Sequence, residues 1–171
     1  MKEIILLSAE HAELYRTIRL EALKNNPEAF ASSYEEEVEL DMINFKNRLH
    51  SSHSYTFGAC SEKQLVGTVT LVHESKSKLQ HRATIYAMYV SLEYRGIGFA
   101  RALMQRAITH AKNLSIIEQI YLTVVTENQP AKNLYQSLGF QVYAEERNAL
   151  KIQDTYYDEQ HMVCYLNKPL N

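Results

Sequence analysis

The sequence predicts an α/β fold with a mixed sheet, in which an antiparallel N-terminal meander joins a parallel strand–helix–strand unit and helices cover both faces. Three β-like runs between positions 55 and 90 are separated by short polar turns, which favours antiparallel pairing. After position 96 the apolar residues change to helical spacing. Another β-like run follows at 120–125, and a helix between two strands favours parallel pairing with a right-handed crossover.

The first fifty residues are expected to form one strand and two helices. In order, the patterns predict a strand over 4–7, a helix over 9–24, an irregular polar segment at 31–37 and a helix over 41–50. Ser8 is a suitable N-cap for the first helix, and the Asn-Asn-Pro sequence at 25–27 is a typical stop. The second helix has Met42, Phe45 and Leu49 on one face.

The rest of the chain supplies the meander and the crossover unit. The predicted strands cover 55–60, 65–72, 83–90 and 120–125, followed by 140–145 and 157–166. Apolar residues between Ile97 and Ala111 recur at three- and four-residue intervals, which predicts an amphipathic helix of about four turns. Pro130 can open a further helix, and Gly139 is a natural stop for it.

Size and composition favour one domain spanning residues 1–171, since domains of about 100–150 residues are common. The net charge of −2 argues against nucleic acid as a partner. No stretch approaches the ~20 apolar residues of a membrane span, and the first apolar run is too short for a signal peptide. We therefore expect a cytoplasmic protein without membrane association. Cys60 and Cys164 are expected to be buried thiols, and no His/Cys cluster predicts a metal.

The segment around which the chain is organised is the glycine loop at 95–101, between a predicted strand and a predicted helix. Backbone N–H groups at a helix N-terminus favour an anion, and glycine lets a phosphate approach closely. A dinucleotide-binding loop would follow the first strand of the chain, whereas this loop lies in mid-chain. A P-loop is excluded because no Lys-Ser/Thr pair follows the glycines of this loop.

A second motif about thirty residues downstream indicates which kind of phosphate ligand the loop would bind. The loop carries Arg95, Gly98 and Ala100, and the downstream segment carries Asn128, Ala131, Leu134, Tyr135, Gly139 and Phe140. These residues match the Arg/Gln-x-x-Gly-x-Gly/Ala and Asn…Ala…Leu-Tyr…Gly-Phe motifs of the GCN5-related N-acetyltransferase (GNAT) superfamily. The chain resembles this superfamily in both motifs, in their spacing and in its order of strands from position 4 to 166.

The resemblance implies that acetyl-CoA is the acyl donor. Its pyrophosphate would sit on the backbone N–H groups of Arg95, Gly96, Ile97, Gly98, Phe99, Ala100 and Arg101. Its pantetheine arm would pair like an extra strand with Met88, Tyr89 and Val90, in the gap beside the strand at 119–125. Asn128 would hydrogen-bond the arm, or serve as a helix N-cap, or do both.

The resemblance also implies two catalytic roles, a general acid and a general base, and the family's residue for the base is missing here. Tyr135 would lie near the thioester sulfur, where its phenol can protonate the departing thiolate. Many relatives carry a glutamate eleven residues before the motif's first arginine, but Thr84 stands there and cannot act as a base. Tyr86, His81 and the acidic run at 35–37 are the remaining candidates for the base, and the acidic run is also explained as a solvated loop.

The predicted activity is acetyl transfer from acetyl-CoA to a primary amine, by direct attack in a ternary complex and without a metal. In the family the acceptor side comes from the first two helices and their connector, where Phe30, Tyr34 and Glu36 are the candidate residues. Acids there would suit a cationic amine, either a small molecule or a lysine of a peptide. The alternative is a non-catalytic acyl-CoA-binding sensor. The strand at 157–166 is able to pair between subunits of a homodimer, or within one chain.

Overall fold

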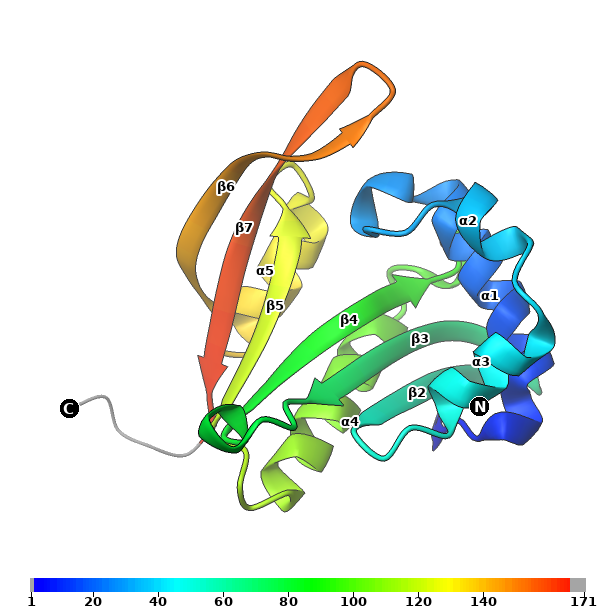
Figure 1. The fold of residues 1–171 in the computed structure, drawn as a ribbon, viewed down its shortest axis with the longest axis horizontal. Helices are drawn as coiled ribbons and strands as arrows, with labels where there is room; N and C mark the ends of the chain where they lie inside the picture. Colours follow the sequence, from blue (N-terminus) through cyan, green and yellow to red (C-terminus); the bar gives the residue numbers. More distant parts are fainter. Residues whose placement is uncertain (1, 167–171) are drawn as a thin grey trace.

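Seven strands form one mixed sheet in the computed structural model, which describes residues 2–166 (Figure 1). The strands are β1 (Lys2–Leu6), β2 (Ser54–Ser61), β3 (Gln64–His73), β4 (Arg82–Val90), β5 (Gln119–Val125), β6 (Gln141–Ile152) and β7 (Thr155–Tyr165). Their order across the sheet is β1-β2-β3-β4-β5-β7-β6, and β4 and β5 are the one parallel pair. The predicted antiparallel meander and parallel crossover unit are confirmed.

Helices cover both faces of the sheet, as predicted. They are α1 (Ala12–Asn25), α2 (Tyr34–Val38), α3 (Met42–Leu49), α4 (Phe99–Asn113) and α5 (Gln129–Ser137), with 3₁₀ turns η1 (Ala9–His11), η2 (Pro27–Ala29), η3 (Ser77–Leu79) and η4 (Leu92–Tyr94). One apolar cluster joins α4 and α5 to the sheet, and a second joins α1 and α3 to the opposite face. No helix within residues 2–166 is long and apolar enough to cross a membrane.

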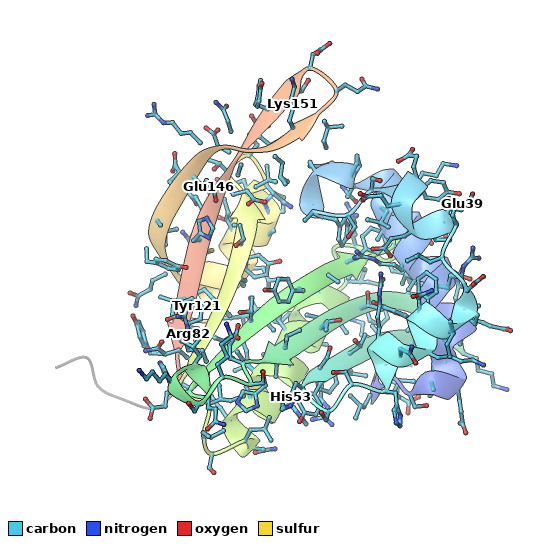
Figure 2. All side chains as sticks on the ribbon, in the orientation of Figure 1. Glu39, His53, Arg82, Tyr121, Glu146 and Lys151 are labelled. Atoms are coloured by element: carbon cyan, nitrogen blue, oxygen red, sulfur yellow. The ribbon has the colours of Figure 1, made fainter. Side chains whose placement is uncertain are left out.

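The parallel strands β4 and β5 are paired only over the first three residues of each. Arg82, Ala83 and Thr84 face Gln119, Ile120 and Tyr121, and no further pairs follow. The Arg82 guanidinium lies 4.1 Å from the centre of the Tyr121 ring at this paired end (Figure 2). Beyond it the two strands separate, as the ribbon shows (Figure 1). Both inner edges therefore carry backbone groups that no neighbouring strand satisfies.

The segment expected to be irregular at 31–37 contains a helix, so that prediction is wrong. Ser33 is the N-cap of α2 and its hydroxyl accepts a hydrogen bond from the Glu36 N–H at 3.2 Å. The Glu36 carboxylate accepts one from the Ser33 N–H at 2.7 Å. This reciprocal pair, a capping box, satisfies two backbone donors and stabilises a short polar helix. The Ser-x-x-Glu pattern that encodes it was visible in the sequence.

The C-terminal strands also differ from the prediction. The strand expected over 140–145 continues to Ile152, with a shift of register between Glu146 and Leu150 and a φ of +53° at Asn148. The predicted strand ended too early because β6 lies at the edge of the sheet, where its residues are mostly exposed and polar. β7 is paired with β5 on one side and β6 on the other. The closing strand thus pairs within one chain, and its two edges are both used.

Both cysteines are free thiols. Cys164 is buried, as predicted, and Cys60 is half-buried.

Glu37 ties the three N-terminal helices together. Its carboxylate, whose side chain is only 3% exposed, accepts hydrogen bonds from Arg19 of α1 at 2.7 and 3.1 Å and from Arg48 of α3 at 2.8 Å. Burial alone would raise the pKa of Glu37, but the hydrogen bonds and charges of the two arginines outweigh it and lower the pKa to about 2. The interpretation of the acidic run as a solvated loop is therefore wrong for Glu37.

We expect Glu37→Gln to lower the free energy of unfolding by about 3 kcal/mol at pH 7, because each unit of pKa shift is worth about 1.4 kcal/mol. A lowered pKa in the folded state stabilises the fold above the unfolded value of 4.5 and ceases to do so as the pH falls toward 2. Urea unfolding at pH 7 and pH 3 checks both points. The difference from the wild type should shrink at pH 3, and Glu39→Gln, at an exposed position (Figure 2), should behave like the wild type.

Candidate active site

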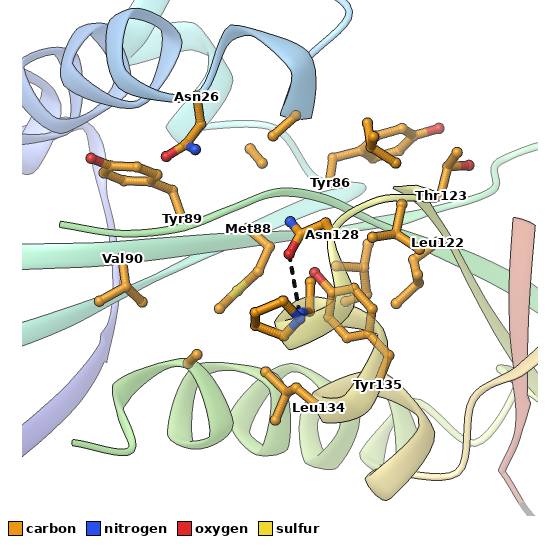
Figure 3. Close-up of a pocket in the computed structure, with 18 of the residues that line it drawn as sticks. Asn26, Tyr86, Met88, Tyr89, Val90, Leu122, Thr123, Asn128, Leu134 and Tyr135 are labelled. Carbon is orange, nitrogen blue, oxygen red and sulfur yellow. Dashed lines mark hydrogen bonds between the residues drawn. The ribbon is translucent and has the colours of Figure 1, made fainter. Parts of the chain in front are cut away.

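A cavity of about 510 Å³ lies between the separated halves of β4 and β5 (Figure 3). The glycine loop, the start of α5 and two residues of the β6–β7 hairpin complete its walls. The residues predicted for the donor that line it are Met88, Tyr89, Val90, Arg95, Gly96, Gly98, Ala100 and Asn128, and Tyr135 lines it as well. Two motifs separated by about thirty residues in the sequence thus meet at one opening.

The glycine loop ends in the N-terminus of α4. Gly96 and Gly98 have φ values of +77° and +93°, which glycine adopts without strain, and Gly98 is the N-cap of the helix. The N–H groups of the first helical turn have no partner within the helix, so the end attracts an anion. A Cβ at Gly96 would meet nothing within 4 Å, which makes its conformation, rather than crowding, the reason for glycine.

Three predicted loop residues do not line the cavity with their side chains. Phe99 is 2% exposed and belongs to the core, and Arg101 donates a hydrogen bond to the Ser137 hydroxyl at 2.8 Å. Ile97 is half-exposed, and its carbonyl accepts a hydrogen bond from the Lys2 ammonium group. Only their backbone N–H groups are placed for the predicted role, at the start of α4.

Arg95 holds the loop to the strand before it. Its Nε donates to the Val90 carbonyl at 2.8 Å and its guanidinium donates to the Asn26 side chain at 2.6 Å. The guanidinium also lies 5.5 Å from the centre of the Tyr89 ring. The backbone N–H of Arg95 donates to the Leu92 carbonyl at 3.3 Å. This N–H is therefore not free for an anion, contrary to the prediction.

A β-bulge interrupts β4 inside the cavity. Thr68 and Thr70 of β3 face Tyr89 and Tyr86, so that two residues of β4, Ala87 and Met88, oppose one residue of β3. Ala87 has a φ of +52°, which is rare for alanine. A bulge leaves a residue out of the ladder and bends the strand. Nothing in the composition of this strand marks the bulge.

Asn128 and Tyr135 lie on α5. The Asn128 side-chain oxygen accepts a hydrogen bond from the Ala131 N–H at 3.2 Å, which confirms the N-cap alternative (Figure 3). Its amide nitrogen faces the same cavity as the rest of the residue. Tyr135 is 7% exposed, and its hydroxyl points into the cavity (Figure 3). Burial raises the pKa of Tyr135 to about 12, so the phenol stays protonated at physiological pH.

The predicted candidates for the base differ in whether they line the cavity. Thr84 and Tyr86 line the cavity, and Tyr86 is 54% exposed. His81 precedes the paired end of β4, where its carbonyl accepts hydrogen bonds from the N–H groups of Glu118 and Gln119, and it does not line the cavity. Glu37 is engaged with its two arginines.

Two carboxylates that the sequence did not single out line the same cavity. Glu159 of β7 lies opposite Val125 of β5, and Glu28 belongs to η2. Burial raises the pKa of Glu159, with Glu146 adding to the shift and His161 opposing it. Neither position was foreseeable from a local pattern, and that of Glu159 depends on the insertion of β7 between β5 and β6.

A second cavity of about 480 Å³ lies on the α1–α3 side of the sheet. It shares four lining residues with the first, namely Ala29, Ala31, Tyr86 and Ala87. Phe30, predicted for the acceptor, lines it, whereas Tyr34 and Glu36 line neither cavity. Within residues 2–166 no group of three or more His, Cys, Asp or Glu side chains is arranged to hold a metal ion.

Comparison with known proteins decides the family. The model of the acetyltransferase (GNAT) family matches residues 13–140. The chain belongs to the GNAT family of acetyltransferases. Spermidine N(1)-acetyltransferase from Vibrio cholerae is 29% identical over 143 residues, which are 83% of this chain and 80% of that protein. L-amino acid N-acetyltransferase AaaT from Escherichia coli is 25% identical over 163 residues, which are 95% of this chain and 98% of that protein.

Solved GNAT structures share the fold at lower identity. The structure of yncA from Salmonella typhimurium with its cofactor acetyl-CoA has a TM-score of 0.83 at 16% identity, over 100% of this chain and 97% of that one. A GNAT acetyltransferase from Streptococcus pneumoniae has a TM-score of 0.80 at 20% identity, over 98% and 100% of the two chains. The predicted resemblance is confirmed, and the protein is an N-acetyltransferase of this family that uses acetyl-CoA.

Proposed function

We propose that this GNAT acetyltransferase passes the acetyl group of acetyl-CoA to a primary amine that attacks the thioester directly, while both substrates are bound. The observation that carries the proposal is the single cavity that contains the helix N-terminus, the β4 bulge and the Tyr135 hydroxyl. Direct attack is favoured because neither Cys60 nor Cys164 lines this cavity to form an acyl-enzyme.

The donor would lie along the unpaired inner edge of β4. The N–H groups at the start of α4 would hold the pyrophosphate, and Met88, Tyr89 and Val90 would offer backbone groups to the amides of the pantetheine arm. The amide nitrogen of Asn128 is free to donate to the same arm while its oxygen caps α5. Bound acetyl-CoA supplies an activated acyl group and a thiolate leaving group.

The transfer forms one N–C bond and breaks one C–S bond, while the amine loses a proton and the departing sulfur gains one. The Tyr135 phenol, which is protonated before the reaction, gives its proton to the sulfur as negative charge develops there and regains one from solvent afterwards. Glu159 is the proposed acceptor of the amine's proton, directly or through water, because its carboxylate lines the cavity and its pKa is raised by burial. It takes the role for which Thr84 is unsuited.

The biological setting is also a proposal. The acceptor is an amine of a small molecule or a peptide, the enzyme is cytoplasmic, and it acts without nucleic acid or membrane partners. The net charge of −2 and the match to small-molecule acetyltransferases support this. A homodimer made by strand pairing would use the outer strands β1 or β6, since β7 is paired on both sides within the chain.

We expect Gly98→Ala to raise the Kd for CoA at least about ten-fold, because alanine at a φ of +93° costs about 1–2 kcal/mol and shifts the loop. Isothermal titration with CoA measures the effect. Gly139→Ala is the matched control, since Gly139 has a φ of +94° at the end of α5, outside the cavity. If both variants bound CoA like the wild type, the loop would not be the pyrophosphate site.

We expect Tyr135→Phe to lower kcat by roughly 10²- to 10⁴-fold, the range for loss of a general acid, while the Kd for acetyl-CoA stays within about two-fold. A thiol-release assay over a panel of amines gives kcat. Tyr55→Phe, outside both cavities, is the control. Unchanged turnover would contradict the role of Tyr135, and acetyl-CoA binding without turnover on any amine would support the alternative function as a sensor.

We expect Glu159→Gln to lower kcat/KM at least about 10²-fold and to remove the acidic limb of its pH profile. In the wild type the rate should fall as the pH drops through the raised pKa of Glu159, since the protonated carboxyl cannot accept a proton. Glu145→Gln, a neighbouring carboxylate of β6 outside the cavity, should keep the limb. An intact limb in Glu159→Gln would exclude Glu159 as the base.

A further inference from the structure

The second cavity carries excess positive charge. Its charged lining residues are Arg19, Arg48 and Glu37, which leaves one guanidinium charge without a counterion in the wall. Glu37 stays ionised above pH 4 because its two arginines hold its pKa low. A cavity wall with this composition favours an anionic group and repels a cationic one.

The two guanidinium groups are held in place with donors to spare. Arg19 uses its Nε and one terminal nitrogen on the Glu37 carboxylate, and stacks 4.8 Å from the centre of the Phe30 ring. Arg48 uses one terminal nitrogen on Glu37 and lies 5.3 Å from the centre of the Phe45 ring. Since a guanidinium has five N–H donors, both arginines retain donors for a further acceptor. Such a fixed pair suits the two oxygens of a carboxylate.

Hydroxyl groups complete the polar wall. Thr56 and Thr70 are both buried, and their hydroxyl oxygens lie 2.9 Å apart on neighbouring strands β2 and β3. Both residues line the second cavity beside the arginines. The side of the cavity that faces the sheet is therefore polar and uncharged, and it presents no carboxylate that would pair with a second amine.

The first cavity has the opposite character where the acceptor would enter. Glu28 and Glu159 line it, and Ala29, the residue after Glu28, belongs to both cavities. The two cavities also share Tyr86 and the bulge residue Ala87. An acceptor that bridges them would place its amine beside the carboxylates and the thioester, and its other end beside the arginines.

We propose that the acceptor is a small amine that also carries a carboxylate, the class of free amino acids, and that Arg48 and Arg19 bind this carboxylate. The inference deepens the proposed acetyl transfer and rests on it. It corrects the expectation that the acceptor side is acidic, since Glu36 caps α2 and Glu37 is neutralised. A polyamine would place a second positive charge against the arginines.

Matched acceptors test the proposal with the wild-type enzyme. Each set keeps the carbon chain and changes one group. The group at the far end changes in δ-aminovalerate, pentylamine and cadaverine, and the group on the amine-bearing carbon changes in L-leucine, isopentylamine and L-leucinamide. We expect kcat/KM to be roughly ten- to hundred-fold higher for the best carboxylate-bearing acceptor than for its matched neutral amine, as charged hydrogen bonds predict. The diamine should be the poorest acceptor of its set.

Two substitutions locate the effect. Arg48→Gln should remove the preference, so that kcat/KM for the carboxylate-bearing acceptor falls to that of its matched neutral amine, while Arg19 still holds Glu37. Arg16→Gln is the matched control, because Arg16 donates to the Val38 carbonyl and also lies over the Phe45 ring but lines neither cavity. Circular dichroism shows whether each variant is folded. The acceptor panel with the wild-type enzyme tests the proposal even if a variant does not fold.

The outcomes separate this inference from the proposed function. Equal or better turnover of the neutral amine, the diamine or the amide in every set would overturn the carboxylate site and leave amine acetylation standing. A retained preference in folded Arg48→Gln would overturn the assignment to the arginines. Binding of acetyl-CoA without turnover of any amine would overturn both proposals at once.

Discussion

The divergence of β4 from β5 is the constraint on which the rest of the site depends. Two parallel strands that pair over three residues and then part leave two rows of backbone donors and acceptors inside the molecule. Such groups cost free energy unless something bonds them. The sheet stays intact because β5 is secured on its other side by seven pairs with β7. The opening is therefore built into a stable sheet, and a substrate with amide groups along its length matches it.

The proposed recognition of the donor would rely on backbone far more than on side chains. The helix N-terminus and the edge of β4 would both act through peptide groups. Phe99, Ile97 and Arg101 have side chains engaged elsewhere. Backbone groups do not depend on which side chains the chain carries, so few identical residues would be needed to preserve such a site.

What the sequence could predict follows from whether the signal is local. The glycine loop, the Asn128 cap and the Tyr135 motif each lie within a few consecutive residues, so their places in the fold were foreseeable. Glu159 was not, because its position depends on β7 inserting between β5 and β6. The bulge at Ala87 depends on the register against β3, which no composition encodes. The helix at Tyr34–Val38 could have been predicted, because its capping box is a local pattern in the sequence. The polar composition of this segment favoured an irregular structure instead.

The Arg19–Glu37–Arg48 cluster links the stability of the N-terminal helices to the charge of the second cavity. One carboxylate joins α1, α2 and α3, and the same carboxylate leaves the cavity with one unneutralised guanidinium. A substitution in this cluster that changes which acceptor charge is preferred therefore also changes how the three helices are attached. Removing Arg48 gives up one of the two guanidinium contacts to a buried carboxylate, whereas removing Glu37 leaves two like charges facing each other. Selectivity is easier to alter at Glu28, which lines the first cavity and takes no part in the ion pairs that join these helices.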